Sequence, residues 1–220
     1  MYQDRREAGR RLAERLLHLK EDHPVILALP RGGVPVGFEI AAALSAPLDL
    51  LLVRKIGVPW QPELAVGAVV DGQQPETFIN REVLESLNIP ESYVAEEAAR
   101  QLAEIERRRG LYLDGRPRIE VRDRTAVVVD DGIATGATVR VALRAVRRAA
   151  PARLVLATPV APASTIAALR SEVDEIVCPL IPEDFGALSL HYADFDQVSD
   201  DEVIRLIGQA RVDARAPAET

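Results

Sequence analysis

Five short runs of apolar residues recur along the chain, and most of them precede a segment with apolar residues at helical spacing. The runs occupy residues 25–29, 48–53, 125–129, 154–158 and 175–177, and the helical patterns occupy residues 34–44, 139–149 and 166–169. The runs are largely apolar throughout rather than alternating, which is typical of strands that are covered on both faces. This order predicts an α/β fold, a parallel or mostly parallel β-sheet flanked by helices, with right-handed crossovers.

Two stretches depart from this alternation. Residues 56–118 contain a Pro- and Gly-containing loop over 57–64, a hairpin expected around residues 71–72, and a charged helical segment over 96–109. Residues 179–198 contain two prolines, a glycine and a group of aromatic residues. Ligands of open α/β sheets bind beyond the carboxyl ends of the strands, so we expect both excursions to form a lid or hood over that edge. The loop over 57–64 would close over the site.

The composition and net charge limit the classes of molecule that the protein is expected to bind. The 220 residues suit a single domain, and 27 Lys and Arg against 34 Asp and Glu give a net charge of −7. An acidic balance argues against nucleic acid or an anionic membrane as the main partner, but it allows a small phosphorylated ligand held by backbone amides and one or two cations. One cysteine, Cys178, excludes an internal disulfide framework. The charged start of the chain and the short apolar runs predict a cytoplasmic protein with neither signal peptide nor membrane span.

The third apolar run carries the strongest chemical signal, because it ends in two adjacent acids, Asp130 and Asp131. A loop of small residues follows and leads into a helical pattern, and this loop comprises Ala134, Thr135, Gly136, Ala137 and Thr138. The backbone N–H groups of such a loop can converge on an anion, with Gly136 free to adopt a positive φ. The following helix directs its positive end at the same place. With two threonine hydroxyls as further donors, the loop has the properties of a phosphate cradle.

The two acids indicate what else the ligand carries. Carboxylates repel a phosphate at close range, so Asp130 and Asp131 should contact a neutral part of the same ligand. Vicinal sugar hydroxyls suit them because both hydroxyls are donors, and a phosphate next to a diol is a ribose 5-phosphate. The alternative interpretation is structural, with Asp-Asp-Gly as a strand-ending turn and the threonines as helix caps.

The string from Val127 to Thr138 resembles the phosphoribosyl-pyrophosphate binding motif of the type I phosphoribosyltransferases. The resemblance extends over roughly residues 22–198 and looks most like a bacterial branch of phosphoribosyltransferase-like proteins. It implies a parallel sheet flanked by helices, with a small, variable hood over the site. It also implies Mg²⁺ as a cofactor that bridges pyrophosphate and ribose hydroxyls, served only indirectly by Asp130 and Asp131.

Two further segments supply groups for the pyrophosphate end of such a ligand. The resemblance places the pyrophosphate-binding loop at Arg31, Gly32 and Gly33, where the glycines allow close backbone approach and the arginine can fork onto a phosphate. Arg54 and Lys55 end the second apolar run, and fixed cations there would stabilise the charge that gathers on the departing pyrophosphate. The alternatives are a plain glycine-rich turn and a solvated strand end.

The acceptor side is expected within residues 179–198. In purine-salvage phosphoribosyltransferases a proline, an aromatic residue three positions later and an Asp-aromatic pair line the base pocket, and Pro182 and Phe185 match that spacing. Asp194 and Phe195 come two residues later than the resemblance requires. Phe185 could stack on a ring and Asp194 could accept from it or hold a metal, but the aromatic group is equally typical of a hydrophobic core.

Several arginines lie in helical, Glu-rich surroundings and are interpreted as solvated faces: Arg5, Arg6, Arg10, Arg11, Arg107, Arg108 and Arg109. The three histidines are scattered and predict no metal ligand set.

The resemblance implies an enzyme of nucleotide metabolism. It would transfer ribose 5-phosphate from 5-phosphoribosyl 1-pyrophosphate to a nitrogen acceptor such as a nucleobase, with release of pyrophosphate, and it is compatible with a homodimer. The first alternative is a regulatory protein that senses phosphoribosyl pyrophosphate without catalysis. The second is a phosphosugar-binding module or hydrolase.

Overall fold

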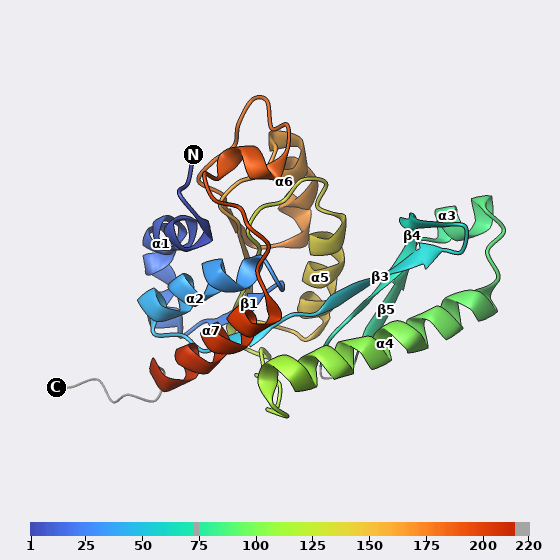
Figure 1. The fold of residues 1–220 in the computed structure, drawn as a ribbon, viewed down its shortest axis with the longest axis horizontal. Coiled ribbons are helices and arrows are strands. Elements are labelled where there is room, and N and C mark those ends of the chain that lie inside the picture. Colours follow the sequence, from blue (N-terminus) through green and yellow to red (C-terminus); the bar gives the residue numbers. More distant parts are fainter. Residues whose placement is uncertain (73–74, 214–220) are drawn as a thin grey trace.

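A central parallel sheet carries a long arm at one side (Figure 1) in the computed structural model, which describes residues 1–72 and 75–213. The sheet has the order β2-β1-β6-β7-β8, and its strands are β1 (Val25–Ala28), β2 (Leu48–Leu50), β6 (Thr125–Val129), β7 (Arg153–Ala157) and β8 (Glu175–Val177). All neighbouring pairs are parallel. The α/β fold with a parallel sheet, predicted from the continuous apolar runs, is therefore confirmed.

Helices cover both faces of this sheet, which explains why the strands are apolar on both sides. Ile26 and Val127 pack in one core with α1 (Arg5–Leu16) and α2 (Gly33–Leu44). Leu27 and Val128, the next residues along the same strands, pack in a second core on the opposite face. The helices of that face are α5 (Ala137–Arg148) and α6 (Ala163–Leu169).

The remaining helical elements surround this core. Three short 3₁₀ segments are η1 (Leu17–Asp22), η2 (Arg170–Glu172) and η3 (Leu188–His191), and the last helix is α7 (Asp200–Asp213). Within residues 1–72 and 75–213, none of the helices combines the length and apolar character that a bilayer crossing needs.

The second strand is shorter than its apolar run predicts. The run extends over residues 48–53, but β2 ends at Leu50. The Leu51 N–H still donates to the Ala28 carbonyl oxygen at 2.9 Å, and the chain then leaves the parallel sheet. At Val53 it begins a strand of a different sheet, paired with Val70.

The arm, residues 53–113, is built on that second sheet. Its order is β3-β4-β5, its pairs are antiparallel, and its elements are β3 (Val53–Val58), β4 (Gln61–Val70), β5 (Glu76–Ile79), α3 (Arg81–Ser86) and α4 (Glu91–Leu113). β4 and β5 confirm the hairpin expected around residues 71–72. The loop expected over 57–64 is wrong, because these residues form the turn and the strand ends of the β3–β4 hairpin. Pro59 favoured a loop in the sequence, but it lies in the turn, where a missing backbone N–H costs nothing.

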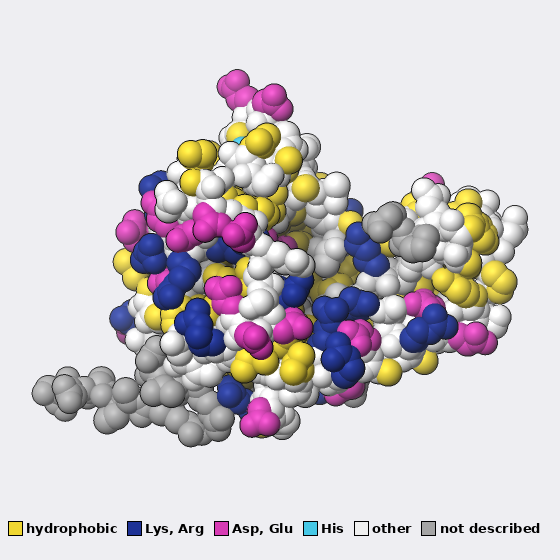
Figure 2. Space-filling view, viewed as in Figure 1, with side chains coloured by type: hydrophobic (Ala, Val, Ile, Leu, Met, Phe, Trp, Pro, Cys, Tyr) yellow, Lys and Arg dark blue, Asp and Glu magenta, His cyan; other side chains and the backbone are white. Residues whose placement is uncertain are grey.

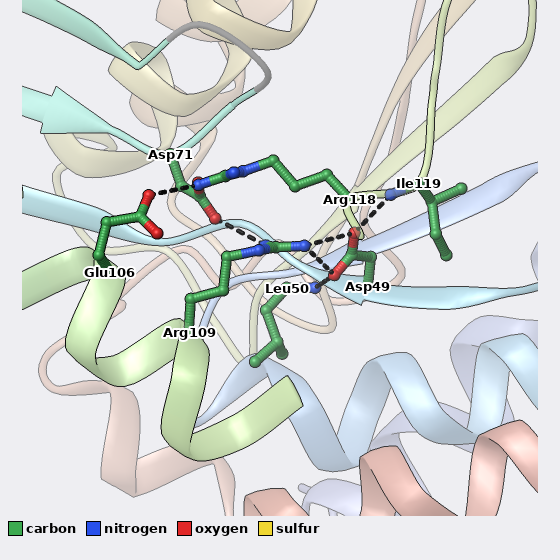
Figure 3. A network of polar contacts seen from close by, with 7 residues as sticks. All are labelled: Asp49, Leu50, Asp71, Glu106, Arg109, Arg118 and Ile119. Atoms are coloured by element: carbon green, nitrogen blue, oxygen red, sulfur yellow. Dashed lines mark hydrogen bonds and ion pairs between the residues drawn. The ribbon is translucent and has the colours of Figure 1, made fainter. Parts of the chain in front are cut away.

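An ion network joins the root of the arm to the parallel sheet (Figure 3). The Arg109 guanidinium of α4 donates to Asp49 of β2 at 3.2 Å and to Asp71, which follows β4, at 2.8 Å. Asp71 also accepts from Arg118 at 2.7 Å, and Asp49 accepts from the Ile119 N–H at 2.9 Å. Arg109 is only 6% exposed, so its assignment to a solvated face is wrong. The predicted solvated face is correct for Arg107, which lies two positions earlier on α4 and has a side chain that is 62% exposed.

The outer surface mixes both signs of charge. Figure 2 shows Lys and Arg side chains interspersed with Asp and Glu over the face in view, and hydrophobic side chains at the end of the arm. The large apolar residues of the arm's sheet that are exposed are Trp60, Leu64 and Ile79.

Candidate functional site

The candidate site lies at the carboxyl ends of two neighbouring strands, whose following helices pack on opposite faces of the sheet. β1 and β6 lie side by side, and they continue into α2 on one face of the sheet and α5 on the other. Open α/β sheets bind ligands at such a switch point, beyond the carboxyl ends of the strands. The two loops that leave this edge are residues 29–33 and 130–136.

Glycines allow these two loops to touch. A side chain at Gly33 would place its Cβ 2.7 Å from the Val129 carbonyl oxygen, and one at Gly32 would place it 2.1 Å from Asp131 Oδ2. The Leu29 N–H donates to the Val129 carbonyl oxygen at 2.9 Å, which fixes the first loop against the second. The predicted loop of Arg31, Gly32 and Gly33 therefore lies beside the acid pair.

The loop from Ala134 to Thr138 has the backbone conformation that the sequence predicts. Gly136 has φ +75° and is the N-cap of α5, and its helix start has no side-chain cap. The first-turn amides of α5 are thus free of side-chain partners and suited to an anion. Ala134, Thr135 and Ala137 are exposed and Thr138 is partly exposed.

The loop is fixed from outside by neighbouring elements. The Thr165 hydroxyl of α6 donates to the Ala134 carbonyl oxygen at 2.5 Å, and the Ile133 N–H donates to the Val160 carbonyl oxygen at 3.0 Å. A preformed loop has less conformational freedom to lose when a ligand binds.

Asp131 is held by residues far away in the sequence. Arg5 of α1 donates from Nε to Asp131 Oδ2 at 2.6 Å, and both side chains are 11% exposed. The Tyr192 hydroxyl donates to the Asp131 carbonyl oxygen at 2.5 Å. Arg5 was expected on a solvated face, and this expectation is wrong.

Asp130 is the less buried residue of the pair, but its carboxylate lies against Asp131. Asp131 is 8% exposed, whereas Asp130 is partly exposed, and one of its carboxylate oxygens accepts from the Asp131 N–H at 2.9 Å. Burial and the neighbouring Asp131 carboxylate raise the pKa of Asp130 well above its ordinary range, against a smaller lowering effect of Arg5. A partner that donates hydrogen bonds or carries positive charge would favour the ionised form.

The acid pair suits a magnesium ion that arrives with its ligand. Within the described part of the chain, no group of three or more His, Cys, Asp or Glu residues is arranged to hold a metal ion. Asp130 and Asp131 are nonetheless hard oxygen donors beside an anion-binding loop, and Mg²⁺ commonly takes one or two carboxylates together with substrate oxygens and water. The residues present therefore fit a Mg²⁺ ion that binds together with a substrate.

The three cations expected at the pyrophosphate end have different surroundings. Arg31 Nη1 lies 3.5 Å from Asp200 Oδ1 at the start of α7. Arg54 Nε donates to Gln101 Oε1 of α4 at 2.8 Å, so it points to the α4 side of the arm's sheet. Lys55 is exposed and its register position lies on the opposite face, with Val53, which packs in the core formed with α5. The structure thus separates Arg54 from Lys55.

The aromatic group of residues 185–195 packs against itself and against the start of the chain. Phe185 lies 5.2 Å from His191 between ring centroids, Phe195 stacks on Tyr192 at 4.8 Å, and Tyr192 lies 5.6 Å from Tyr2. Both phenylalanines adjoin a small buried cluster that includes the two tyrosines. These contacts are those of a hydrophobic core, the alternative that the sequence left open.

Asp194, the remaining expected acceptor-side residue, is exposed. Its backbone N–H donates to the Gln3 carbonyl oxygen at 2.8 Å, and its carboxylate accepts from the Asp196 N–H at 3.2 Å. The first contact belongs to a short pairing between residues 2–3 and 191–194.

Sequence reasoning missed Arg5, Tyr192 and Asp200 at this edge. Arg5 and Asp131 are 126 positions apart, and the Arg-rich pattern of α1 does not distinguish the one arginine that turns inward. The signal that the sequence offers is spacing: Arg5 comes three and four positions before Ala8 and Gly9, which lie on the buried face of α1.

A cavity of about 370 Å³ lies elsewhere, between the root of the arm and the end of α5. Its walls include Asp49, Asp71, Arg109 and Arg118, whose charges are already paired with one another. We therefore place the candidate site at the strand edge, where the anion-binding loop and the acids meet.

Comparison with known proteins gives a consistent result. Residues 2–191 match the family described as the phosphoribosyl transferase domain. Two curated Mycobacterium tuberculosis proteins, from strains CDC 1551 and H37Rv and each named as a candidate phosphoribosyl transferase, are 43% identical to this chain over 213 residues. The match covers 97% of this chain and 48% of theirs, so the chain spans about half the length of the curated relatives it matches.

The fold is also similar to a solved structure. The crystal structure of the protein TT1426 from Thermus thermophilus has a TM-score of 0.81 and 40% identity to this chain, with coverage of 95% of this chain and 98% of that one.

Proposed function

The chain belongs to the phosphoribosyl transferase domain family, and on that premise we propose that it is an enzyme that uses 5-phosphoribosyl 1-pyrophosphate. It transfers the 5-phosphoribosyl group to a ring nitrogen of a nucleobase-like acceptor and releases pyrophosphate. The observation that carries this proposal is the meeting of an uncapped, positive-φ anion loop with two carboxylates at one strand edge.

The 5-phosphate occupies the loop from Ala134 to Thr138. Its oxygens accept from the backbone amides at the start of α5 and from the hydroxyls of Thr135 and Thr138. The positive end of the α5 dipole adds to this attraction. The exposure of the loop and the absence of a side-chain cap on α5 support this assignment.

The acids face the sugar. The acid pair of Asp130 and Asp131 supplies an acceptor for the ribose hydroxyls and serves a Mg²⁺ ion carried by the substrate. When bound, this ion supplies positive charge that offsets the developing charge on pyrophosphate.

The pyrophosphate end lies towards the first loop and the arm. Gly32 and Gly33 let backbone amides approach the phosphates, and Arg31 leaves Asp200 to pair with them. Lys55, whose own side chain is exposed, reaches the leaving group from the face of the arm's sheet that it shares with Val53. Arg54, paired with Gln101, supports this strand rather than the leaving group.

The reaction breaks the bond between the anomeric carbon and pyrophosphate and forms one between that carbon and the acceptor nitrogen. Positive charge develops on the sugar ring between the two events, and the carboxylates of Asp130 and Asp131 stabilise it. Pyrophosphate leaves with the bonding electron pair, and the acceptor N–H proton passes to water. Positioning and fixed charges supply the catalysis, and no covalent nucleophile is required.

The acceptor binds on the side of residues 179–198, where Phe185 offers an aromatic edge and Asp194 an exposed carboxylate. We assign the arm and residues 179–198 the part of a hood that limits water access. The packing of Phe185 against His191 makes it a weaker base-stacking candidate than its sequence position implies.

The test is pyrophosphate release from phosphoribosyl pyrophosphate and Mg²⁺ in the presence of individual nucleobases, with the nucleotide product identified by mass spectrometry. We expect release that depends on one base or a small set of bases. Tight binding of phosphoribosyl pyrophosphate without release with any base would favour the sensing protein. Release without any base would favour the hydrolase.

A further inference from the structure

An arginine outside the motif pairs with one acid of the pair. Arg5 contacts Asp131 Oδ2 at 2.6 Å, and it is the one cation within ion-pair distance of either Asp130 or Asp131 among the residues that the structure describes. The contact is mostly sheltered from solvent, with both side chains 11% exposed, so water screens it weakly.

The guanidinium of Arg5 is fixed on three sides. Besides the Asp131 contact, Nη1 donates to the Asp196 carbonyl oxygen at 2.7 Å, and the guanidinium carbon lies 3.8 Å from the centroid of the Phe195 ring. Phe195 in turn stacks on Tyr192, whose hydroxyl donates to the Asp131 main chain. A side chain immobilised in this way has little conformational freedom left to lose when a ligand binds.

The surrounding contacts distinguish the two acids. Asp131 Oδ2 is engaged by Arg5 and lies against Gly32, where a side chain would place its Cβ 2.1 Å away. Asp130 has no ion pair with a described residue and is the more exposed of the two. The pair therefore presents one carboxylate that is neutralised and fixed by Arg5, and one that has no cation partner among the described residues.

We propose that Arg5 is a positioning residue of this site: it fixes Asp131 and offsets its charge, so that Asp130 is the acid that contacts the sugar hydroxyls. The inference rests on the proposed function, because it assigns parts of the same ribose 5-phosphate site. It also assigns a role in the site to the paired segments at residues 2–5 and 191–196.

The role requires a cation and not merely a large side chain. Two ionised carboxylates and a phosphate group at one strand edge repel one another. With Arg5 present, the net charge of the three side chains Arg5, Asp130 and Asp131 is −1 when both acids are ionised. Without it the charge is −2 and the Asp131 side chain loses its fixed partner.

The experiment compares Arg5→Met and Arg5→Lys with wild type, using ribose 5-phosphate and inorganic phosphate as probes in titration calorimetry. We expect Arg5→Met to weaken ribose 5-phosphate binding by about tenfold or more, and phosphate binding by less than about threefold. Arg5→Lys should recover most of the lost selectivity, because it restores the cation. If Arg5 acted through packing alone, Arg5→Lys would not restore the selectivity that Arg5→Met loses.

Arg6→Met is the matched control. Arg6 is the next residue of α1 and donates to Glu39, away from the acid pair, so its removal should leave both affinities unchanged. Thermal unfolding of each variant shows whether the fold is retained, and if Arg5→Met does not fold, Arg5→Lys and Asp131→Asn carry the comparison.

A double-mutant cycle identifies the partner through which Arg5 acts. If Arg5 acts through Asp131, Arg5→Met should cost much less selectivity in an Asp131→Asn background than in wild type. Full additivity, or unchanged selectivity in both Arg5→Met and Arg5→Lys, would overturn the inference while leaving the proposed function intact. Failure of wild type to bind ribose 5-phosphate at all would overturn the proposed function and this inference with it.

Discussion

Gly136 combines a backbone requirement with a place in the anion loop. Its φ of +75° lies in the left-handed region, where a side chain costs about 1–2 kcal/mol. A Cβ there would also lie 3.0 Å from Thr165 Cγ2 of α6. We expect Gly136→Val to distort the loop and weaken ribose 5-phosphate binding by more than about tenfold, measured by calorimetry.

Gly115 is a control that shares the left-handed backbone conformation of Gly136 but lies outside the candidate site. Its φ is +68°, and a Cβ added there meets nothing within 4 Å. Gly115→Val should lower the free energy of unfolding by a comparable amount and leave ribose 5-phosphate affinity unchanged. Equal losses of affinity in the two variants would mean that Gly136 acts through global stability.

The sequence predicts the conformation of some single residues but not the long-range partners of others. The positive φ of Gly136 follows from local chemistry, since a loop of small residues enters a helix and only glycine adopts that conformation freely. The roles of Arg5 and Arg109 depend on partners at distant positions, Asp131 and Asp49. A pattern of charges along one helix contains no information about such partners.

Strand β3 divides the two cations of the Arg-Lys pair between its faces. Arg54 donates to Gln101 of α4, whereas Lys55 lies on the face shared with Val53. We expect Lys55→Ala to weaken phosphoribosyl pyrophosphate binding by about tenfold or more and to leave ribose 5-phosphate binding nearly unchanged, because the latter lacks pyrophosphate. Competition titrations with both ligands measure the difference.

Arg54→Ala is the matched change one position earlier. It removes a guanidinium from the α4 side of the strand and should affect thermal stability more than either affinity. The opposite pattern, with pyrophosphate-specific loss in Arg54→Ala alone, would show that Arg54 reaches the leaving group.

At the scale of elements, the apolar runs predict the parallel strands well because those strands are buried on both faces. The boundary between β2 and β3 is missed for the same reason, since Leu51 and Leu52 are buried in the transition between two sheets and continue the apolar run. Hydrophobicity reports burial and not the sheet to which a buried residue belongs.

At the scale of the whole molecule, the free energy of unfolding depends on how the arm is attached to the parallel sheet. Arg109 links α4 to both Asp49 and Asp71, and all three are buried. Removing one partner of a buried ion pair leaves an uncompensated charge, which costs about 3–5 kcal/mol. We expect Arg109→Met to lower the free energy of unfolding by about this amount, measured by urea denaturation.

Arg107→Met tests the opposite environment on the same helix. Arg107 pairs with Glu104 at the surface, with 62% of its side chain exposed, so its removal should cause no measurable change. A similar loss in both variants would assign the effect to helix propensity instead of the network.

The pairing of residues 2–3 with residues 191–194 bears on how the protein is synthesised. A ribosome completes Tyr2 and Arg5 first, and their partners Tyr192, Phe195 and Asp196 are added about 190 positions later. Contacts of such long sequence separation pay the cost of closing a large loop, and domains usually fold as units during synthesis. The contacts of Tyr2 and Arg5 with these partners therefore form only after residue 196 has left the ribosome, although the helix that carries Arg5 can already pack on α2.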